Sequence, residues 1–600
     1  MRLSVLIAAS TVALAPAAHG QQSRELRPAL HASVAFTGAD GQSLGRIDPG
    51  VPFDITVTVT NSLGRDPPAG LTLAGWLRPV SDSNLDCTEA ARSFLATARL
   101  PTGAIKLNGP VIGVASRDGA FVIADPELNL ATANLMGAAR FDSPPASLVA
   151  DIDNRRFLAA FPDRGEVQAI DVPTAASRAV VGELSQPVAA FPGPGGAVWV
   201  LDRAEGKGEG AVLHVQPPLP PETIVQDALT LTPGIRGDTL AVAGTSSSIL
   251  LDAASAEVLL RIDQGAVDAL PLDDDTGSFA LARLRGQEVL IHYLDTPDHP
   301  VRVALPDPAT RIVSSIYGRW ILAFDPTSLQ PAALIDVASG TAVQRITTGV
   351  PVSEIAFTDR AAYLMLADQS RVGVLDLTTV SPDKPSLLRD VMLGQPQSPL
   401  RQGPGMLAAL WPQPGMLAVH AQNYTGFLIH DSSVMGDSPP MSALRLRGGV
   451  PAVVATFDRS FREVSRGQFH TTAVLPAPGL YELVTTTGIG ALSFCAALPE
   501  TSGEAPPEEQ PGRLSALRDA ADPTQVYLRF QTESGAPAPA GHLTVLVSGL
   551  RSPWRKLSQL QLDTDGRAIQ PVSVPVHDLT VIAVTASDGP GFHPFVLEPP

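Results

Sequence analysis

The sequence predicts an all-β protein built around a β-propeller of about seven blades, with β-sandwich domains flanking it. Short strand pairs recur along the middle of the chain, and 56 Pro and 51 Gly residues separate the strands with turns. Only 17% of the 600 residues are charged and 44% are hydrophobic, so the chain has ample apolar surface to bury. We therefore expect an ordered, strand-rich protein along most of its length.

Residues 1–20 have the features of a secretory signal peptide. Arg2 supplies a positive charge, an apolar run extends from Leu3 to Pro16, and Ala18-His19-Gly20 places small residues at the cleavage positions. An uncleaved membrane anchor is the alternative, but the run is shorter than the roughly 18 apolar residues that a membrane helix needs. We expect a periplasmic or secreted protein with no membrane span.

Residues 21–100 are predicted to form an N-terminal β-sandwich of the immunoglobulin-like kind. From Phe53 to Thr60 every second residue is apolar, as in a strand with one buried face. A turn cluster from Asn61 to Gly70 precedes a second strand that includes Trp76. A short helix is expected from Thr88 to Ala98.

Residues 101–433 carry a degenerate repeat. The clearest unit, Ala361 to Asp376, has a strand, a polar turn and a second strand that ends in Asp. Related units occur at Arg156 to Asp171, Ala197 to Asp202, Thr239 to Asp252 and Arg319 to Asp336. Strand pairs at a spacing of roughly 40 to 50 residues are typical of propeller blades, and the segment has room for about seven of them.

This pattern of turn, strand and Asp resembles the YVTN and cytochrome d1-type β-propeller repeats of exported bacterial proteins. The resemblance covers about half of the chain, and it implies the propeller fold. Some propellers of that group hold haem d1 or pack against quinone and haem partners. This sequence has no Cys-x-x-Cys-His motif for covalent haem and no identifiable axial His, so we expect no bound cofactor of that kind.

Beyond the repeats, residues 434–500 are predicted to form a second β-sandwich, with strands at Val450 to Phe457, Gly467 to Leu475 and Leu480 to Cys495. Residues 501–513 combine Pro with Glu, which favours an extended linker. Residues 514–600 show further alternating strands and are expected to form a separable C-terminal β-sandwich.

The two cysteines, Cys87 and Cys495, have two interpretations. Two lone cysteines in an oxidising compartment tend to pair, whereas in a reducing compartment they would be thiols able to react or to bind metal. Because export is expected, we predict a disulfide that links the segment before the repeats to the segment after them.

The sequence contains no established catalytic motif. It has no Gly-x-Ser-x-Gly, no His-Glu-x-x-His and no phosphate-binding Gly-x-x-x-x-Gly-Lys loop. The glycine-rich stretch Gly206 to Gly210 indicates a hairpin turn. Asp273 to Asp275 and Asp563 to Gly566 offer carboxylates to calcium, but they lack the spaced ligands of an EF-hand, and turn formation explains both.

One local cluster suggests a metal site. Met435, Met441, His430 and His470 lie around the junction between the repeats and the second sandwich, together with His420. Thioether and imidazole ligands suit copper, particularly Cu(I), whereas packing at a domain interface is the alternative role of these side chains. We predict that copper, if any transition metal binds, uses Met435 and Met441 with His430 or His470.

The leading functional hypothesis is an exported, non-enzymatic propeller that binds or scaffolds a protein partner through its loop faces. The alternative is an accessory protein of periplasmic redox or copper metabolism, which delivers metal or docks with a dehydrogenase or cytochrome. An enzyme with its site in the central channel is a third hypothesis. The net charge of −18 argues against nucleic acid and anionic membrane surfaces as partners.

Overall fold

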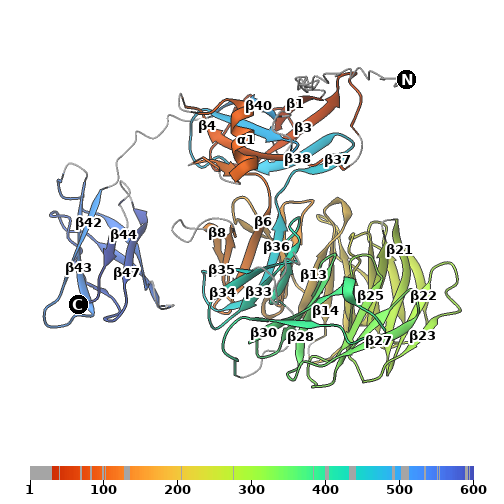
Figure 1. The fold of residues 1–600 in the computed structure, drawn as a ribbon. Helices are drawn as coiled ribbons and strands as arrows, with labels where there is room; N and C mark the ends of the chain where they lie inside the picture. Colours follow the sequence, from red (N-terminus) through yellow and green to blue (C-terminus); the bar gives the residue numbers. More distant parts are fainter. Residues whose placement is uncertain are drawn as a thin grey trace, which may run out of the picture.

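A computed structural model describes residues 30–600 of the chain, apart from residues 39–40, 68–69, 82–83, 98–99, 102, 127–134, 205, 275, 383, 399–404, 432–440, 489–492, 502–511, 533–534, 550–551, 553, 588–591 and 593–594. The described residues contain 48 β-strands, one α-helix and three 3-10 helices, at Pro162–Arg164, Pro194–Gly196 and Leu377–Thr379. Figure 1 shows three parts, which are a ring of sheets, a sandwich on one end of the ring and a C-terminal domain beside it. No helix in the described part of the chain is long and apolar enough to cross a membrane.

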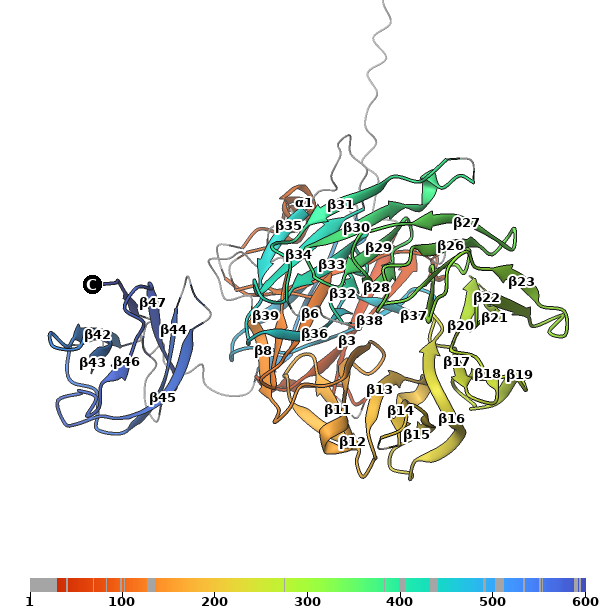
Figure 2. The same cartoon turned by 90° about the horizontal axis from the view of Figure 1, so that it is seen from below.

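The ring is a β-propeller of eight four-stranded blades (Figures 1 and 2), which confirms the predicted all-β propeller class. The strands of each blade are given from the innermost outwards. Blade 1 contains β36 (Pro451–Asp458), β6 (Pro110–Ser116), β7 (Ala120–Ala124) and β8 (Leu135–Arg140), and blade 2 contains β9 (Ser147–Asp151), β10 (Arg156–Phe161), β11 (Glu166–Asp171) and β12 (Ser177–Val181). Blade 3 contains β13 (Pro187–Pro192), β14 (Val198–Arg203), β15 (Gly210–Val215) and β16 (Glu222–Pro233), and blade 4 contains β16 again with β17 (Thr239–Gly244), β18 (Ser248–Asp252) and β19 (Val258–Ile262).

Blades 5 to 8 follow the same order of strands. Blade 5 contains β20 (Asp268–Asp274), β21 (Gly277–Arg285), β22 (Glu288–Tyr293) and β23 (Val301–Ala304), and blade 6 contains β24 (Arg311–Ser314), β25 (Trp320–Phe324), β26 (Ala332–Asp336) and β27 (Thr341–Ile346). Blade 7 contains β28 (Val352–Phe357), β29 (Ala361–Leu366), β30 (Arg371–Asp376) and β31 (Leu388–Met392), and blade 8 contains β32 (Leu407–Ala409), β33 (Gly415–His420), β34 (Thr425–His430) and β35 (Met441–Arg445).

The ring has eight blades, which agrees with the predicted number of about seven to within one blade. Blades 3 and 4 share strand β16, so their strands form one seven-stranded sheet. The first half of β16 pairs with β15, and its second half pairs with β17. Between the halves, Asp227 has a φ of 61°. Its carboxylate accepts hydrogen bonds of 2.9 Å from the Thr245 hydroxyl and the Ser246 amide, which hold this bend in place.

Blade 1 joins the two ends of the ring. Its innermost strand, β36, follows blade 8 in the chain and pairs antiparallel with β6, so that Asp458 lies opposite Pro110. The segment Val450 to Phe457, which the sequence analysis assigned to a separate sandwich, therefore completes the propeller. The ring spans residues 110–458 instead of the predicted 101–433.

Apolar clusters between neighbouring blades hold the ring together. One cluster unites blades 7, 8 and 1 through residues such as Tyr363, Met416 and Val114, and another joins blades 1 and 2 through Phe121 and Phe157. Five further clusters connect the remaining neighbours in turn. Each blade thus buries its faces only against adjacent blades, as propeller geometry requires.

The segments before and after the ring build one sandwich, which corrects the expectation of two sandwiches over residues 21–100 and 434–500. Its sheets have the orders β1-β3-β38-β37 and β40-β39-β4-β5, and β2 pairs with β41. The elements are β1 (Leu30–Thr37), β2 (Arg46–Ile47), β3 (Phe53–Asn61), β4 (Ala74–Pro79), α1 (Cys87–Thr97), β5 (Ile105–Lys106), β37 (Arg462–Ser465), β38 (Gln468–Ala473), β39 (Tyr481–Thr486), β40 (Ser493–Ala497) and β41 (Glu500–Thr501).

Strands from the two segments pair directly within each sheet of this sandwich. Phe53 of β3 lies opposite Ala473 of β38, and Leu77 of β4 lies opposite Leu483 of β39. Neither segment alone can pair these strand edges, so the two segments form a single core. Helix α1 begins one residue before its predicted start, where the Asp86 carboxylate accepts a 2.8 Å bond from the Glu89 amide as an N-cap.

The C-terminal domain has two sheets, with the orders β42-β43-β46 and β45-β44-β47-β48. Val526, Phe530, Val545 and Val547 belong to its own buried core. Its strands are β42 (Arg513–Arg518), β43 (Gln525–Gln531), β44 (His542–Gly549), β45 (Arg555–Gln561), β46 (Val572–Ser573), β47 (Thr580–Ser587) and β48 (Phe595–Leu597).

Arg283 is a buried cation between blades 4 and 5, and its hydrogen-bond partners are neutral groups. Arg283 Nη2 lies 3.0 Å from His292 Nε2, and Arg283 Nη1 donates a 2.9 Å bond to the Gln264 carbonyl. His292 Nδ1 is 2.8 Å from the Pro297 carbonyl oxygen, so the neutral ring donates from Nδ1 and accepts at Nε2. Burial lowers the pKa of His292 below 6.5, and the charge of Arg283 lowers it further, against the opposing effect of the Pro297 hydrogen bond.

This arrangement predicts a loss of stability in acid. Because the pKa of His292 is depressed in the folded protein, the unfolded chain binds the proton more readily, and stability is lost as the pH falls below 6.5. His292→Gln keeps a donor and an acceptor but does not titrate. We expect the melting temperature of this variant to fall less than that of the wild type between about pH 7 and pH 5.5. Equal falls in the two proteins would contradict the assignment.

A second prediction concerns the link between Cys87 and Cys495, which spans 408 residues. The chain-entropy model gives a ceiling of about 6 kcal/mol for a loop of that length. Because strand pairing already holds the same segments together, we expect the double variant Cys87→Ser, Cys495→Ser to lose about 2 to 3 kcal/mol. Calorimetry should therefore show a lower melting temperature. A melting temperature equal to that of the disulfide-bonded wild type would show that the bond is redundant.

Candidate functional site

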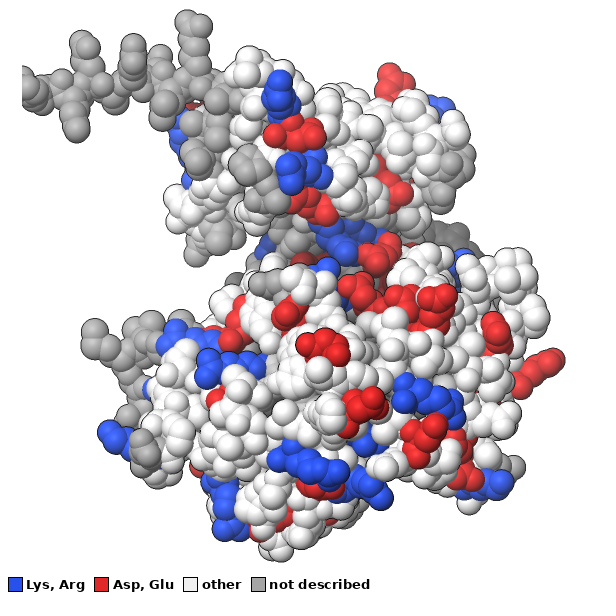
Figure 3. All heavy atoms as spheres, turned by 90° about the vertical axis from the view of Figure 1, so that its right-hand side faces the viewer, with Lys and Arg blue, Asp and Glu red and all other residues white. Residues whose placement is uncertain are grey.

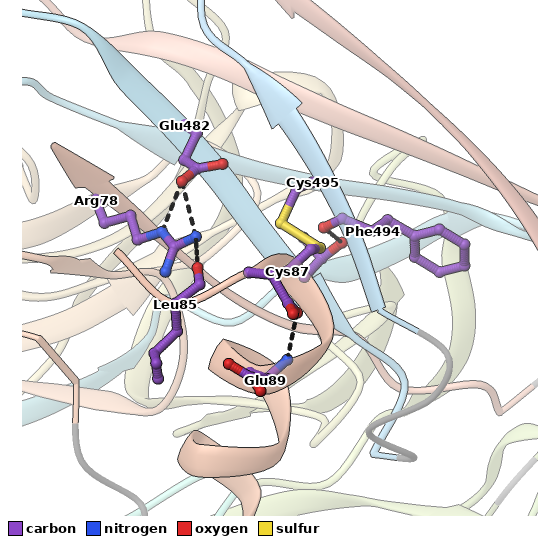
Figure 4. Close-up of a disulfide and its surroundings, with 9 residues drawn as sticks. Arg78, Leu85, Cys87, Glu89, Glu482, Phe494 and Cys495 are labelled. Carbon is purple, nitrogen blue, oxygen red and sulfur yellow. Dashed lines mark hydrogen bonds and ion pairs between the residues drawn. A yellow bond between two sulfur atoms is a disulfide. The ribbon is translucent and has the colours of Figure 1, made fainter. Parts of the chain in front are cut away.

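The predicted disulfide is confirmed. Cys87, at the first residue of α1, bonds to Cys495 of β40, and their Cα atoms are 5.9 Å apart, in the usual range for such a bond. Figure 4 shows that the bond fastens the start of the helix to the sheet. Beside it, Arg78 Nη2 forms a 2.8 Å ion pair with Glu482. The sequence alone does not predict this pair, because its members are 404 residues apart and belong to no motif.

The residues predicted as copper ligands have separate surroundings where the structure describes them. Met435 lies outside the described residues. Met441 begins the outermost strand of blade 8, where it is 45% exposed and lies opposite Ile429. His430 ends the neighbouring strand β34, whereas His470 belongs to β38 of the sandwich. His420, the fifth member of the cluster, is buried in blade 8, with Nε2 2.8 Å from the Gln395 carbonyl oxygen.

His470 takes part in the joint between the sandwich and blade 2. Its Nε2 lies 3.5 Å from Asp54 Oδ1, which also accepts a 2.7 Å bond from the Thr472 hydroxyl. Burial raises the pKa of Asp54, but these two hydrogen bonds outweigh burial and lower it overall. Arg155, from the turn after β9, donates a 3.1 Å bond to the His470 carbonyl. Burial is the main cause of the lowered pKa of Arg155, which is about 10.

His430 lies at a different place, between blades 7 and 8. It lines a small cavity of about 20 Å³ with Tyr363, Asp376 and Asp431. The Tyr363 hydroxyl donates a hydrogen bond to Asp431, and burial followed by this neighbouring carboxylate raises the pKa of Tyr363. The described members of the copper cluster are therefore divided between the sandwich joint and the rim of blade 8. The copper site stays a prediction.

Acidic residues on two innermost strands join neighbouring blades. Asp268 Oδ2 accepts a 3.0 Å bond from the Ile312 amide, and Glu354 Oε2 accepts bonds from the amides of Met406 and Leu407 at 2.8 and 3.1 Å. These carboxylates are occupied by structural bonds. Among the described residues, no group of three or more His, Cys, Asp or Glu side chains is arranged to hold a metal ion.

The two ends of the propeller differ. The sandwich rests on turns of blades 1 and 2, where Arg459 pairs with Asp125 and Arg462 pairs with Asp153. Figure 1 shows the sandwich on one end of the ring, and Figure 2, a view from below, shows the opposite end with the sandwich behind the ring. The loops at this opposite end connect the second to the third strand of each blade and one blade to the next. They form the open end of the propeller, whose edge at blade 1 is contacted by Arg555 of the C-terminal domain, through Asp118 and the Gly448 carbonyl.

Arg–carboxylate pairs surround the open end. They occur in blades 1, 2, 4, 5, 6 and 7, at Arg140–Asp118, Arg164–Asp142, Arg261–Asp263, Arg302–Glu288, Arg345–Asp307 and Arg371–Asp390. In each pair at least one side chain is well exposed, as for Arg140 at 68% and Arg345 at 56%. Figure 3, a view from the side, shows positive and negative side chains interspersed over the lower part of the propeller. The open end therefore carries charge of both signs.

Comparisons with known proteins find only distant similarity to solved structures, which carries no argument about this chain. No family model matches the chain, and a search of curated proteins finds no significant match. Similar solved structures include dihydro-heme d1 dehydrogenase NirN in complex with DHE, with 14% identity, 61% of this chain and 79% of that chain covered, and a TM-score of 0.37. BamB from Moraxella catarrhalis has 14% identity, coverage of 62% and 98%, and a TM-score of 0.37. The β-propeller domain of Cps50 (Swd1) from Myceliophteria thermophila has 13% identity, coverage of 48% and 97%, and a TM-score of 0.32. These values carry no argument about function.

The copper hypothesis has a direct test. Replacing Met435 and Met441 with leucine nearly preserves volume and hydrophobicity, so the protein should fold, while soft-metal affinity should fall if the two thioethers are ligands. Equilibrium dialysis against Cu(I) compares the wild type with this double variant. Equal binding, or no stoichiometric copper on either protein, would assign both methionines to packing.

Proposed function

We propose that this protein is an exported scaffold that binds a protein partner through the open end of its propeller. The observation that carries the proposal is the asymmetry of the ring, since the sandwich rests on one end and leaves exposed loops and paired charges at the other. Loop surfaces at the ends of propellers are large enough for macromolecular partners, and they need no catalytic group to bind them.

The paired charges suit such a role. An exposed ion pair contributes only about 0 to 1 kcal/mol to folding, so its members can exchange partners at low cost. In a complex, Arg140, Arg261 and Arg345 would pair with carboxylates of the partner, while the matching Asp residues would accept its basic groups. Charges of both signs favour a protein surface of complementary pattern, and the net charge of −18 disfavours nucleic acid.

A second candidate is the accessory role in periplasmic redox or copper metabolism. Its support is the resemblance of the repeats to cytochrome d1-type propellers, together with the position of His430 and Met441 on adjacent strands of blade 8. In that case the partner would be a dehydrogenase, a cytochrome or a copper acceptor. This candidate shares the docking step with the first and differs in the partner.

A charge-reversal experiment tests the proposal. Arg140, Arg261 and Arg345 are changed to Glu together, and a control protein carries the same change at Arg513, Arg529 and Arg567, which are exposed on the C-terminal domain. Affinity capture from periplasmic extract identifies the partner of the wild type, and calorimetric titration then measures its affinity for each variant. We expect the first variant to bind about tenfold more weakly or worse, with unchanged folding, and the control to bind normally. Equal affinity of the two variants would remove the open end as the binding surface.

A further inference from the structure

The sandwich contains a cavity of about 730 Å³ between helix α1 and the chain that follows strand β4. Pockets of roughly 300 to 1,000 Å³ suit small organic molecules. Its wall is about equally apolar and polar, with apolar side chains such as Trp76, Leu85 and Leu100 and with the polar residues Arg78, Ser81, Asn84, Ser93 and Thr97. The cavity lies beside the disulfide, away from the open end of the propeller, so it is independent of the proposed protein-binding surface.

Arg78 offers hydrogen-bond donors inside this cavity. Its side chain is only 4% exposed. Its Nε and Nη2 atoms lie 2.8 Å from the same Glu482 oxygen, and Nη2 also donates a 2.8 Å bond to the Leu85 carbonyl. Figure 4 shows this arrangement, with the third nitrogen, Nη1, turned away from Glu482. No described residue accepts a bond from Nη1, whose two N–H groups are therefore available to a ligand.

Trp76 forms part of the cavity wall. The residue is 1% exposed, and its indole Nε1 is buried and makes no hydrogen bond with the described residues. Its ring packs against Phe94 with centroids 4.8 Å apart, which fixes it in the wall. Because Nε1 has almost no accessible surface, a ligand oxygen in the cavity cannot reach it, and Trp76 contributes apolar contact only.

Charge decides between two classes of ligand. Glu482 already neutralises Arg78, so a carboxylate ligand would add an unbalanced negative charge to a partly buried site. A neutral carbonyl oxygen accepts from the same N–H groups without that penalty. The apolar side chains of the wall favour a ring or a branched chain next to the carbonyl. The disulfide holds helix α1 in place, so this wall is formed before any ligand arrives.

We infer that this cavity binds a small, neutral, amphipathic molecule that carries a carbonyl oxygen next to an apolar group. The carbonyl oxygen accepts from Arg78 Nη1, and the apolar group packs on Leu85 and Leu100.

Titration with N-acetyl-phenylalaninamide tests this inference, and N-acetyl-phenylalanine, which has a carboxylate in place of the amide, is the matched comparison. Binding is followed by saturation-transfer NMR and calorimetry. Ser93→Phe fills the cavity from the exposed face of α1, whereas Ala96→Phe places the same ring on an exposed position that does not line it. We expect the amide to bind about fivefold more tightly than the carboxylate, Ser93→Phe to weaken it about tenfold, and Ala96→Phe to have no effect.

Absence of saturable amide binding, equal or tighter binding of the carboxylate, or full binding by Ser93→Phe would each overturn the inference.

Discussion

The structure depends on the meeting of two chain segments that are more than three hundred residues apart, because no blade of a propeller can bury both faces alone. Strand β36, which follows blade 8, inserts as the innermost strand of blade 1 and pairs with β6. The apolar cluster that unites blades 7, 8 and 1 includes residues of both paired strands, such as Val114 and Val454. Closing so long a loop has an entropic cost, which the buried apolar surface of three blades offsets.

The sandwich repeats the same closure at a second level. Strands β3 and β4 come before the ring, and their partners β38 and β39 come after it. The disulfide and the Arg78–Glu482 pair then join the same two segments covalently and electrostatically. The sandwich therefore joins the chain segments that enter and leave the propeller. Because the sandwich rests on blades 1 and 2 at one end of the ring, the loops at the other end stay uncovered by it, and these loops form the open end proposed as the binding surface.

Local sequence patterns predicted the parts of the fold that depend on local pairing. The alternating run from Phe53 to Thr60 and the unit from Ala361 to Asp376 both form strands in the predicted places. The disulfide followed from the cysteine count and the expected compartment. The single sandwich was not predictable in this way, because Phe53 pairs with Ala473 across the whole ring and no periodicity reveals such a register. The cavity donor Arg78 was missed for the same reason, since its partner Glu482 comes from a distant segment.

The repeated Asp at the end of the third strand illustrates why a recurrent acidic residue need not be a functional one. Asp171 accepts hydrogen bonds from the amide and hydroxyl of Thr174, Asp252 accepts them from Ser255, and Asp376 accepts them from Thr378. For Asp252, the backbone bond from Ser255 is the largest cause of a lowered pKa, so the carboxylate is ionised and engaged in its turn.

Each of these residues fixes the turn into the outermost strand, and each blade needs such a turn. The Asp residues of the sequence pattern that predicted the blades therefore serve to form turns. Binding groups are better sought where the fold leaves an accessible donor without an acceptor, as at Arg78 Nη1, or where it leaves charges paired only at the surface.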